Sequence, residues 1–245
     1  MFTLAEDRLT HAPAADAGVA GPSRRNDQTS PQPPLRCDVQ IGSQGLPGEL
    51  ALVPDARGLV IFAHGSGSSR FSPRNRLVAD ILHGYRLDTL LFDLLTEAEA
   101  ADRRQVFDIA LLGQRMGAAL QWSRTDEHTA RLSAGLFGAS TGAAAALTAA
   151  ARHPNWVSSV VSRGGRPDLA AAQLPRVQSP TLLVVGGYDT EVLQLNRSAM
   201  RLLQCESRLE VVPGASHLFE EPGAIETVAH LAGSWFANHL PLWVQ

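Results

Sequence analysis

Short apolar runs alternate with amphipathic segments through most of this chain, and this alternation limits the folds that it can adopt. The clear apolar runs lie at 58–64, 88–94, 132–138, 157–162, 181–187 and 208–214, and two less clear ones lie at 36–42 and 49–54. Helix candidates fall between them, near 74–84, 104–123, 141–152, 191–204 and 223–239. Strands that alternate with helices form a mostly parallel sheet that is covered on both faces. The pattern therefore predicts an α/β fold.

The first 34 residues have a different composition from the rest. The stretch "GPSRRNDQTSPQPP" is rich in Pro, Ser, Arg and Gln and shows no apolar periodicity. A segment of this kind cannot bury enough apolar surface to offset the entropy of ordering it. The sequence predicts a disordered tail at 1–34, followed by one α/β domain at 35–245.

Charge and composition exclude several classes of function. The net charge of −3 gives no electrostatic reason to expect nucleic acid or an anionic membrane as a partner. All 21 basic residues are arginines, so P-loop, Schiff-base and Ser-Lys chemistry are excluded. The two cysteines, Cys37 and Cys205, show no metal-ligand spacing. No signal peptide or membrane span is recognisable, so we expect a cytoplasmic protein without a metal or an organic cofactor.

One serine stands between two glycines where a strand is predicted to become a helix. The stretch "GASTG" runs from Gly138 to Gly142 and places Ser140 at its centre. In this G-x-S-x-G pattern a sharp strand-to-helix turn presents a nucleophilic serine, and glycines leave room for the crossing backbone. The alternative is a close-packed turn with an incidental serine. The preceding apolar strand and the following small-residue helix favour the nucleophile.

A serine nucleophile needs a base, and the base needs an acid that orients it. The pattern predicts both later in the chain, with the acid first and the base after it. Asp189 follows the strand "TLLVVGG", and His217 follows the strand "RLEVVPG". Both lie at the carboxyl ends of strands, on the rim where ligand sites of such sheets occur. The alternatives are a helix-capping role for Asp189 and a backbone-bonded loop histidine for His217.

The same chemistry needs donors for a developing oxyanion. The backbone N–H of Thr141, at the start of a helix, is one candidate. The second is the N–H of Ser66 or Gly67, in the glycine-rich loop "HGSGSSR" after the third strand. We expect His64 to brace this loop rather than to catalyse. We do not expect "GSGSS" to be a phosphate-binding loop, because no lysine follows it.

With these elements together, the sequence resembles the α/β-hydrolase superfamily over roughly residues 35–240, and within it the dienelactone-hydrolase-like branch. The segments "SRGGRPDLA" (162–170), "VGGYD" (185–189) and "GASHLFEEPG" (214–223) carry this resemblance. Some relatives are fused to a phosphoribosyltransferase-like domain, which the first 34 residues do not resemble. Dienelactone hydrolases proper use a cysteine nucleophile, whereas this chain has Ser140.

Only about 18 residues separate the strand at 157–162 from the next, which leaves room for a short helix and not for a helical lid. The charged segment 94–105 is either a partial rim or a solvated loop. Arg163 and Arg166 follow a strand on the catalytic rim, and Arg70 closes the oxyanion loop. Arginine binds carboxylate and phosphate through a bidentate fork, so we expect Arg163 or Arg166 to contact an anionic substrate group. The alternative is that they are solvated or pair with Glu220, Glu221 or Asp168.

The leading prediction is a serine hydrolase with a Ser140–His217–Asp189 triad. It would cleave a small-molecule ester, thioester or lactone through an acyl-enzyme. The alternatives are a non-catalytic binding or partner domain on this scaffold, and the same fold with perhydrolase or C–C hydrolase chemistry. The sequence alone does not identify the natural substrate.

Overall fold

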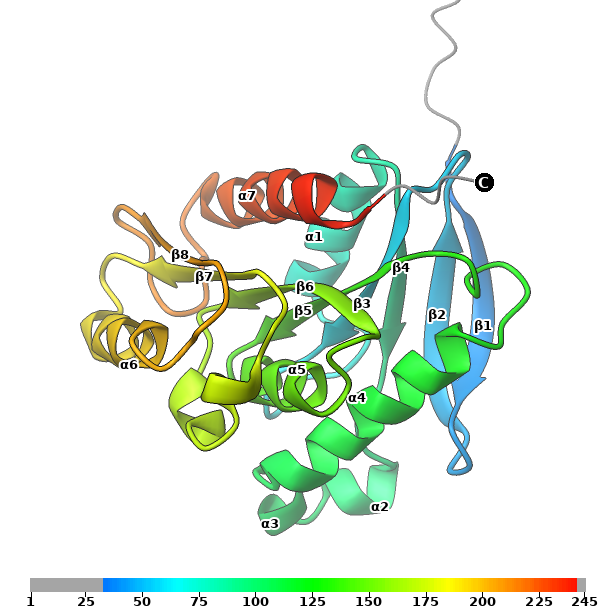
Figure 1. Cartoon of the computed structure of the whole chain (residues 1–245), viewed down its shortest axis with the longest axis horizontal. Coiled ribbons are helices and arrows are strands. Elements are labelled where there is room, and N and C mark those ends of the chain that lie inside the picture. The colour runs from blue at the N-terminus through cyan, green and yellow to red at the C-terminus, as the bar shows by residue number, and fades with distance from the viewer. Residues whose placement is uncertain (1–32, 242–245) are drawn as a thin grey trace, which may run out of the picture. The chain divides into compact units, whose positions relative to one another are not determined.

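The computed structural model describes residues 33–241 and contains one eight-stranded sheet flanked by helices (Figure 1). The tail predicted at 1–34 lies outside these residues, apart from Pro33 and Pro34. The strands are β1 Leu35–Ile41, β2 Leu46–Leu52, β3 Gly58–Ala63, β4 Leu87–Phe92, β5 Ala134–Ala139, β6 Val157–Arg163, β7 Thr181–Gly186 and β8 Ser207–Val212. The helices are α1 Pro73–His83, α2 Glu97–Ala100, α3 Arg103–Val106, α4 Ile109–Ser123, α5 Thr141–Arg152, α6 Thr190–Met200 and α7 Ala224–His239.

The sheet has the strand order β1-β2-β4-β3-β5-β6-β7-β8. Strand β2 is antiparallel to both of its neighbours, and every other pairing is parallel. The mostly parallel sheet predicted from the sequence is therefore confirmed. Strand β5 lies near the middle of the sheet, so the turn after it opens onto the centre of the carboxyl edge.

Both faces of the sheet are buried along its inner strands β3, β4, β5 and β7, which explains the uninterrupted apolar runs in the sequence. In β3, Ile61 and Ala63 pack into one core with α4 and α5, whereas Val60 and Phe62 pack into a second core with α1 and α7. Successive side chains of a strand point to opposite faces, so each strand supplies both cores. Figure 1 shows the helices in two layers, with α1 and α7 on one side of the sheet and α4, α5 and α6 on the other.

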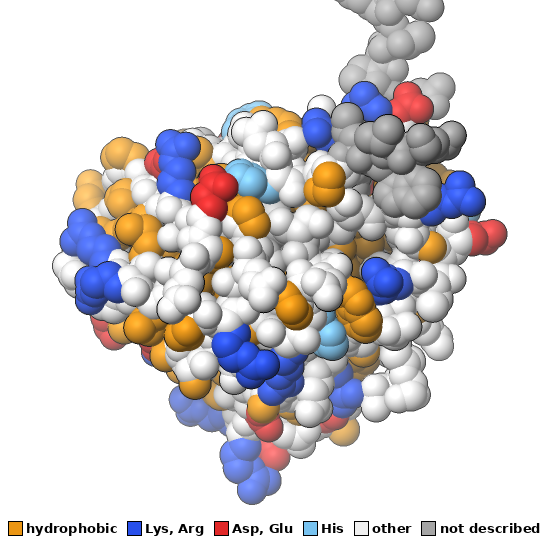
Figure 2. Space-filling model, in the orientation of Figure 1, with side chains coloured by type: hydrophobic (Ala, Val, Ile, Leu, Met, Phe, Trp, Pro, Cys, Tyr) orange, Lys and Arg blue, Asp and Glu red, His pale blue; other side chains and the backbone are white. Residues whose placement is uncertain are grey.

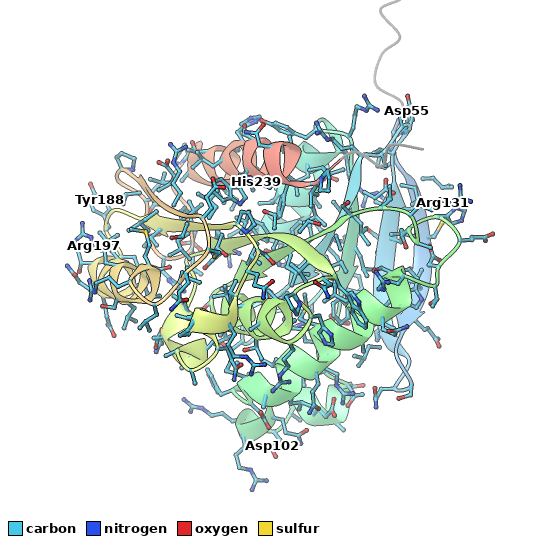
Figure 3. The ribbon with its side chains drawn as sticks, viewed as in Figure 1. Asp55, Asp102, Arg131, Tyr188, Arg197 and His239 are labelled. Carbon is cyan, nitrogen blue, oxygen red and sulfur yellow. The ribbon has the colours of Figure 1, made fainter. Side chains whose placement is uncertain are left out.

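The region between β4 and α4 differs from the expectation. The helix predicted over 104–123 is interrupted, because the Asp108 carboxylate accepts a hydrogen bond from Leu111 N at 3.0 Å and starts α4 there. A further helix, α2, was not expected within 94–105. It begins with a capping box in which Thr96 and Glu99 bond to each other's backbone. The segment is therefore folded, and Asp102 between α2 and α3 is labelled in Figure 3.

Within residues 33–241, none of the helices is long and apolar enough to cross a bilayer. On the face drawn in Figure 2, basic side chains lie singly or in small groups among neutral and acidic ones. The connection between β6 and β7 contains only two short 3₁₀ helices, Pro167–Ala170 and Leu174–Arg176, so it forms no helical lid.

Candidate active site

The turn between β5 and α5 holds Ser140 in an unusual backbone conformation, with φ 51° and ψ −120°. Non-glycine residues rarely adopt such angles, and they persist only where the surrounding structure imposes them. The flanking glycines explain how the turn fits. A Cβ atom at Gly138 would lie 2.4 Å from Ala143 Cα, and one at Gly142 would lie 2.2 Å from Ala63 O. The "GASTG" pattern is thus required by close backbone packing around this turn.

His217 and Asp189 meet across two loops at the same edge of the sheet. His217 Nδ1 and Asp189 Oδ2 are 2.6 Å apart, which is a short, charge-assisted hydrogen bond. Asp189 occupies the N-cap position of α6, but its side chain makes no capping bond. The bond to the carboxylate assigns the proton of a neutral imidazole to Nδ1 and leaves Nε2 as a proton acceptor.

Close packing and one hydrogen bond position the loop that carries His217. A Cβ atom at Gly186, after β7, would lie 2.4 Å from Ala215 O. The Glu221 carboxylate accepts a hydrogen bond from Ser216 N at 3.0 Å, and this bond holds the pKa of Glu221 below its usual value. On the other side, a Cβ atom at Gly164 would lie 3.1 Å from His217 O. Gly164 therefore lets the turn after β6 pass close to the histidine loop.

Ser140 and His217 line one small cavity of about 240 Å³. In the part of the chain that the structure describes, no hydrogen bond joins the Ser140 hydroxyl to His217. Bonds of this kind are often long in ligand-free sites and tighten when substrate binds. The cavity also contains Arg163, at the end of β6, and the residues Arg74 and Asn75 from the first turn of α1.

The oxyanion candidates Thr141, Ser66 and Gly67 all line a second, larger cavity, and Ser66 also lines the smaller one. Thr141 begins α5, where the first N–H groups of a helix have no intrahelical acceptor. Ser66 N donates to Thr141 Oγ1 at 2.9 Å, so its N–H is engaged by that hydroxyl. Gly67 is in the left-handed region, at φ 70°. The larger cavity, about 460 Å³, is lined by Thr141 and the loop 64–70, and its lining also includes the apolar residues Leu94, Leu95, Val106 and Leu112.

His64 braces the loop, as expected. Its Nε2 accepts a hydrogen bond from Leu94 N at 3.1 Å, and its Nδ1 lies 3.0 Å from Gly65 O. Nε2 thus joins the loop after β3 to the loop after β4, whereas Nδ1 bonds within the loop after β3. Burial lowers the pKa of His64, which favours the neutral ring that these bonds require.

The three arginines of the sequence prediction have different environments. The guanidinium of Arg166 is held by both oxygens of Asp168, at 2.9 and 2.8 Å, so Asp168 bonds to an arginine and not to His217. Arg70 pairs with Asp93. Of the three, only Arg163 lines the Ser140 cavity, and the structure pairs the other two with carboxylates.

Sequence reasoning missed Arg74, Asn75 and the apolar side chains of the larger cavity. Arg74 and Asn75 follow "FSP", in which Ser72 caps α1 and Pro73 is its first residue. This helix start was a signal that the first turn of α1 lies on the catalytic rim. Among residues 33–241, no group of three His, Cys, Asp or Glu side chains is arranged to hold a metal ion.

The family model of the "Dienelactone hydrolase family" matches residues 88–237, a range that includes Ser140, Asp189 and His217. The crystal structure of a dienelactone hydrolase from Anabaena variabilis is 51% identical, with a TM-score of 0.82, and the match covers 86% of this chain and 99% of that one. A promiscuous phosphotriesterase from metagenomic libraries, described as dienelactone hydrolase-like, shares the fold at 16% identity and a TM-score of 0.70. That match covers 86% of this chain and 100% of the other.

Two curated relatives come from strains of Mycobacterium tuberculosis, and both are named "Putative phosphoribosyl transferase". Each is 54% identical over 211 residues, which are 85% of this chain and 48% of the relative. The chain thus spans about half the length of the curated relatives it matches. The family match over more than half of the sequence, together with the shared fold, shows that the chain belongs to the dienelactone hydrolase family of hydrolases.

Proposed function

We propose that this hydrolase cleaves esters, thioesters or lactones through a covalent acyl-enzyme, with Ser140 as nucleophile, His217 as general base and acid, and Asp189 as the group that orients His217. The observation that carries the proposal is the 2.6 Å bond between His217 and Asp189, made beside a cavity that also contains the strained Ser140. This combination of nucleophile, base and orienting acid characterises activated serines.

The proposed reaction begins when His217 Nε2 takes the hydroxyl proton of Ser140 while Oγ bonds to the substrate carbonyl carbon. The negative charge that develops on the carbonyl oxygen is stabilised by backbone N–H groups. The bond to the leaving alcohol or thiol then breaks, and His217 returns the proton to that group. A water molecule, deprotonated by His217, then attacks the acyl carbon. The bond from that carbon to Ser140 Oγ breaks, the acid is released, and His217 returns the proton to Oγ.

Thr141 N–H is the first oxyanion donor in this proposal. The second is Ser66 N–H or Gly67 N–H. Because Ser66 N–H donates to Thr141 Oγ1 in the free protein, its use requires the Thr141 side chain to rotate away when the carbonyl oxygen arrives. Each N–H donor aimed at the oxyanion typically stabilises the transition state by about 3 kcal/mol.

A fluorophosphonate probe tests the proposal, because it reacts with an activated serine. We expect stoichiometric labelling that maps to Ser140, and we expect Ser140→Ala and His217→Ala to abolish it. Ser198→Ala, at an exposed serine of α6, is the matched control and should label like the wild type. Absence of labelling in a folded wild-type protein would favour a non-catalytic binding domain instead.

Product analysis separates the remaining chemistries. An ester hydrolase releases an acid and an alcohol from an aryl ester, and hydrogen peroxide should not divert the acyl group to a peracid. Peracid formation as the main product would identify a perhydrolase. The name of the mycobacterial relatives describes proteins of which this chain covers about half, so transfer of a phosphoribosyl group is not part of the proposal.

A further inference from the structure

The hydroxyl group of Thr141 is buried at the candidate active site and has an unused proton. Thr141 is the first residue of α5, directly after Ser140, and it is 4% exposed. A hydroxyl group can donate one hydrogen bond and accept two. Thr141 Oγ1 accepts one from Ser66 N at 2.9 Å, and within the described chain no acceptor receives its proton. A buried donor without a partner requires an explanation.

The start of α5 explains why the protein offers no acceptor. A threonine inside a helix commonly donates to the carbonyl three or four residues earlier, as Thr227 does to Gly223 O at 2.8 Å in α7. For Thr141 the corresponding residues are Gly138 and Phe137, which belong to β5 and pair with a strand on each side. The usual helical acceptor is therefore missing at this position.

The hydroxyl group lies where the reacting carbonyl oxygen of a substrate is expected. Thr141 and Ser66 both line the larger cavity, and Ser66 also lines the cavity that contains Ser140. A Cβ atom at Gly65, the residue before Ser66, would lie 3.2 Å from Ser140 Cβ. The loop that is bonded to the Thr141 hydroxyl therefore packs directly against the candidate nucleophile.

The Thr141 side chain has little freedom to leave this place. A β-branched side chain that is 4% exposed has few other rotamers. The helix start cannot shift either, because a Cβ atom at Gly142 would lie only 2.2 Å from Ala63 O. The bond from Ser66 N also polarises the hydroxyl and makes it a stronger donor. Donation from the present position therefore requires less rearrangement than rotation of the side chain out of the site.

We propose that the Thr141 hydroxyl is an oxyanion donor, which bonds to the carbonyl oxygen as negative charge develops while Ser66 N–H continues to donate to Oγ1. Thr141 would then supply two donors, its N–H and its O–H, and Ser66 would act through the hydroxyl. The proton stays on Oγ1 throughout, and no covalent bond of Thr141 forms or breaks. The inference rests on the proposed serine hydrolase function and adds a catalytic side chain to it.

The test uses steady-state kinetics on p-nitrophenyl acetate. Thr141→Val keeps the shape of the side chain without the hydroxyl. We expect it to lower kcat about 10²-fold with little change in KM, because the charge on the oxygen develops only in the transition state. Thr148→Val is the matched control and should behave like the wild type. Thr148 is 3% exposed in the same helix, its hydroxyl has no partner within the described chain, and it lines neither cavity.

Two further substitutions separate donation from obstruction. Thr141→Ser keeps the hydroxyl and should retain activity within about fivefold of the wild type. Thr141→Ala removes the hydroxyl but frees Ser66 N–H, so we expect a smaller loss than in Thr141→Val, about tenfold. Activity of Thr141→Ala at or above the wild-type level would show that the side chain only obstructs Ser66 N–H, and it would overturn the proposal. The alanine variant also keeps the test decisive if Thr141→Val does not fold, which thermal unfolding shows.

The rate of fluorophosphonate labelling separates failure of this inference from failure of the proposed function, because the phosphoryl oxygen of the probe takes the place of the oxyanion. Labelling of Ser140 that is at least tenfold slower in Thr141→Val than in the wild type supports the hydroxyl donor. Equal labelling rates and equal kcat in the two proteins overturn the donor and leave the nucleophile proposal intact. A folded wild type that neither labels nor cleaves the ester overturns both.

Discussion

At the scale of single residues, Ser140 is both the candidate nucleophile and a strained backbone position. Different substitutions separate these two properties. Its positive φ presents the hydroxyl at the edge of the sheet, and this conformation is strained for any residue with a Cβ. Strain that serves function is expected to lower stability, because it persists only through the packing around it. The candidate nucleophile should therefore be a position where activity and stability oppose each other.

We predict that Ser140→Ala and Ser140→Gly both abolish ester hydrolysis, with kcat reduced on the order of 10⁴-fold or more. Glycine relieves the strain and alanine does not, so we expect Ser140→Gly to be more stable than Ser140→Ala by about 1 kcal/mol. Urea unfolding of the two variants measures the difference. Equal stabilities would show that the turn stores no strain, and activity within tenfold of wild type in either variant would exclude Ser140 as nucleophile.

The second residue-scale prediction concerns the acid. Asp189→Asn keeps the size of the side chain but cannot stabilise a protonated His217, so kcat should fall by roughly 10²–10⁴-fold. Asp168→Asn, which only weakens a pair with Arg166, should stay within about threefold of wild type. Steady-state kinetics on an aryl acetate decide the matter. A larger loss in Asp168→Asn would reverse the assignment.

At the scale of elements, the junction of β5 with α5 depends on the absence of side chains. Gly142, in the first turn of α5, lies against the backbone of the loop after β3, with Ala63 O at 2.2 Å and His64 O at 2.5 Å from a would-be Cβ. Neither oxygen belongs to a movable side chain. The close approach brings the oxyanion loop to the start of the nucleophile helix.

Gly142→Ala should therefore destabilise the protein by about 3 kcal/mol or more, through a steric clash that the backbone cannot avoid. Gly214→Ala is the matched control, because its Cβ would meet nothing within 4 Å and its only cost is the left-handed φ of 73°. That cost should be about 1 kcal/mol. Thermal unfolding of both variants measures the contrast, and a smaller loss in Gly142→Ala than in Gly214→Ala would contradict the packing argument.

At the scale of the whole molecule, one buried carboxyl in β4 should shape the dependence of stability on pH. Asp88 is 2% exposed and accepts a hydrogen bond from Val53 N at 2.8 Å. Burial raises its pKa from 3.8 to about 6. Between these two values the folded state binds more protons than the unfolded state, so this group makes the fold less stable as the pH rises through that window.

Asp88→Asn replaces the carboxyl with a neutral group of similar shape that can still accept from Val53 N. We expect the variant to be more stable than wild type at pH 7 by about 1–3 kcal/mol, and the difference to shrink toward zero as the pH falls below about 4. Denaturant unfolding at several pH values tests this. A stability difference that does not change with pH would show that Asp88 does not titrate in this window.

The sequence by itself determined the strands, the order of most elements and the meeting of Ser140, Asp189 and His217 at one edge of the sheet. Apolar runs indicate buried strands, glycines indicate close backbone packing, and both are local features of the sequence. For this reason β3 to β8 and the turn at Ser140 were predictable. Sequence order also predicted that Asp189 and His217 would share an edge, because the carboxyl ends of parallel strands meet there. It did not predict α2 or the interruption before Asp108, where side-chain caps rather than periodicity decide the backbone.

Only the tertiary structure decided which charges are paired. Arg163 and Arg166 stand three residues apart and are equivalent in the sequence, yet Asp168 neutralises one and nothing acidic reaches the other within the described chain. Arg74 joins Arg163 from a helix 89 positions earlier in the chain, a distance over which no local pattern carries information. Charge pairing depends on which groups meet in three dimensions and on how deeply they are buried. The reason is that a charged side chain is well solvated in water and loses this solvation free energy inside the protein.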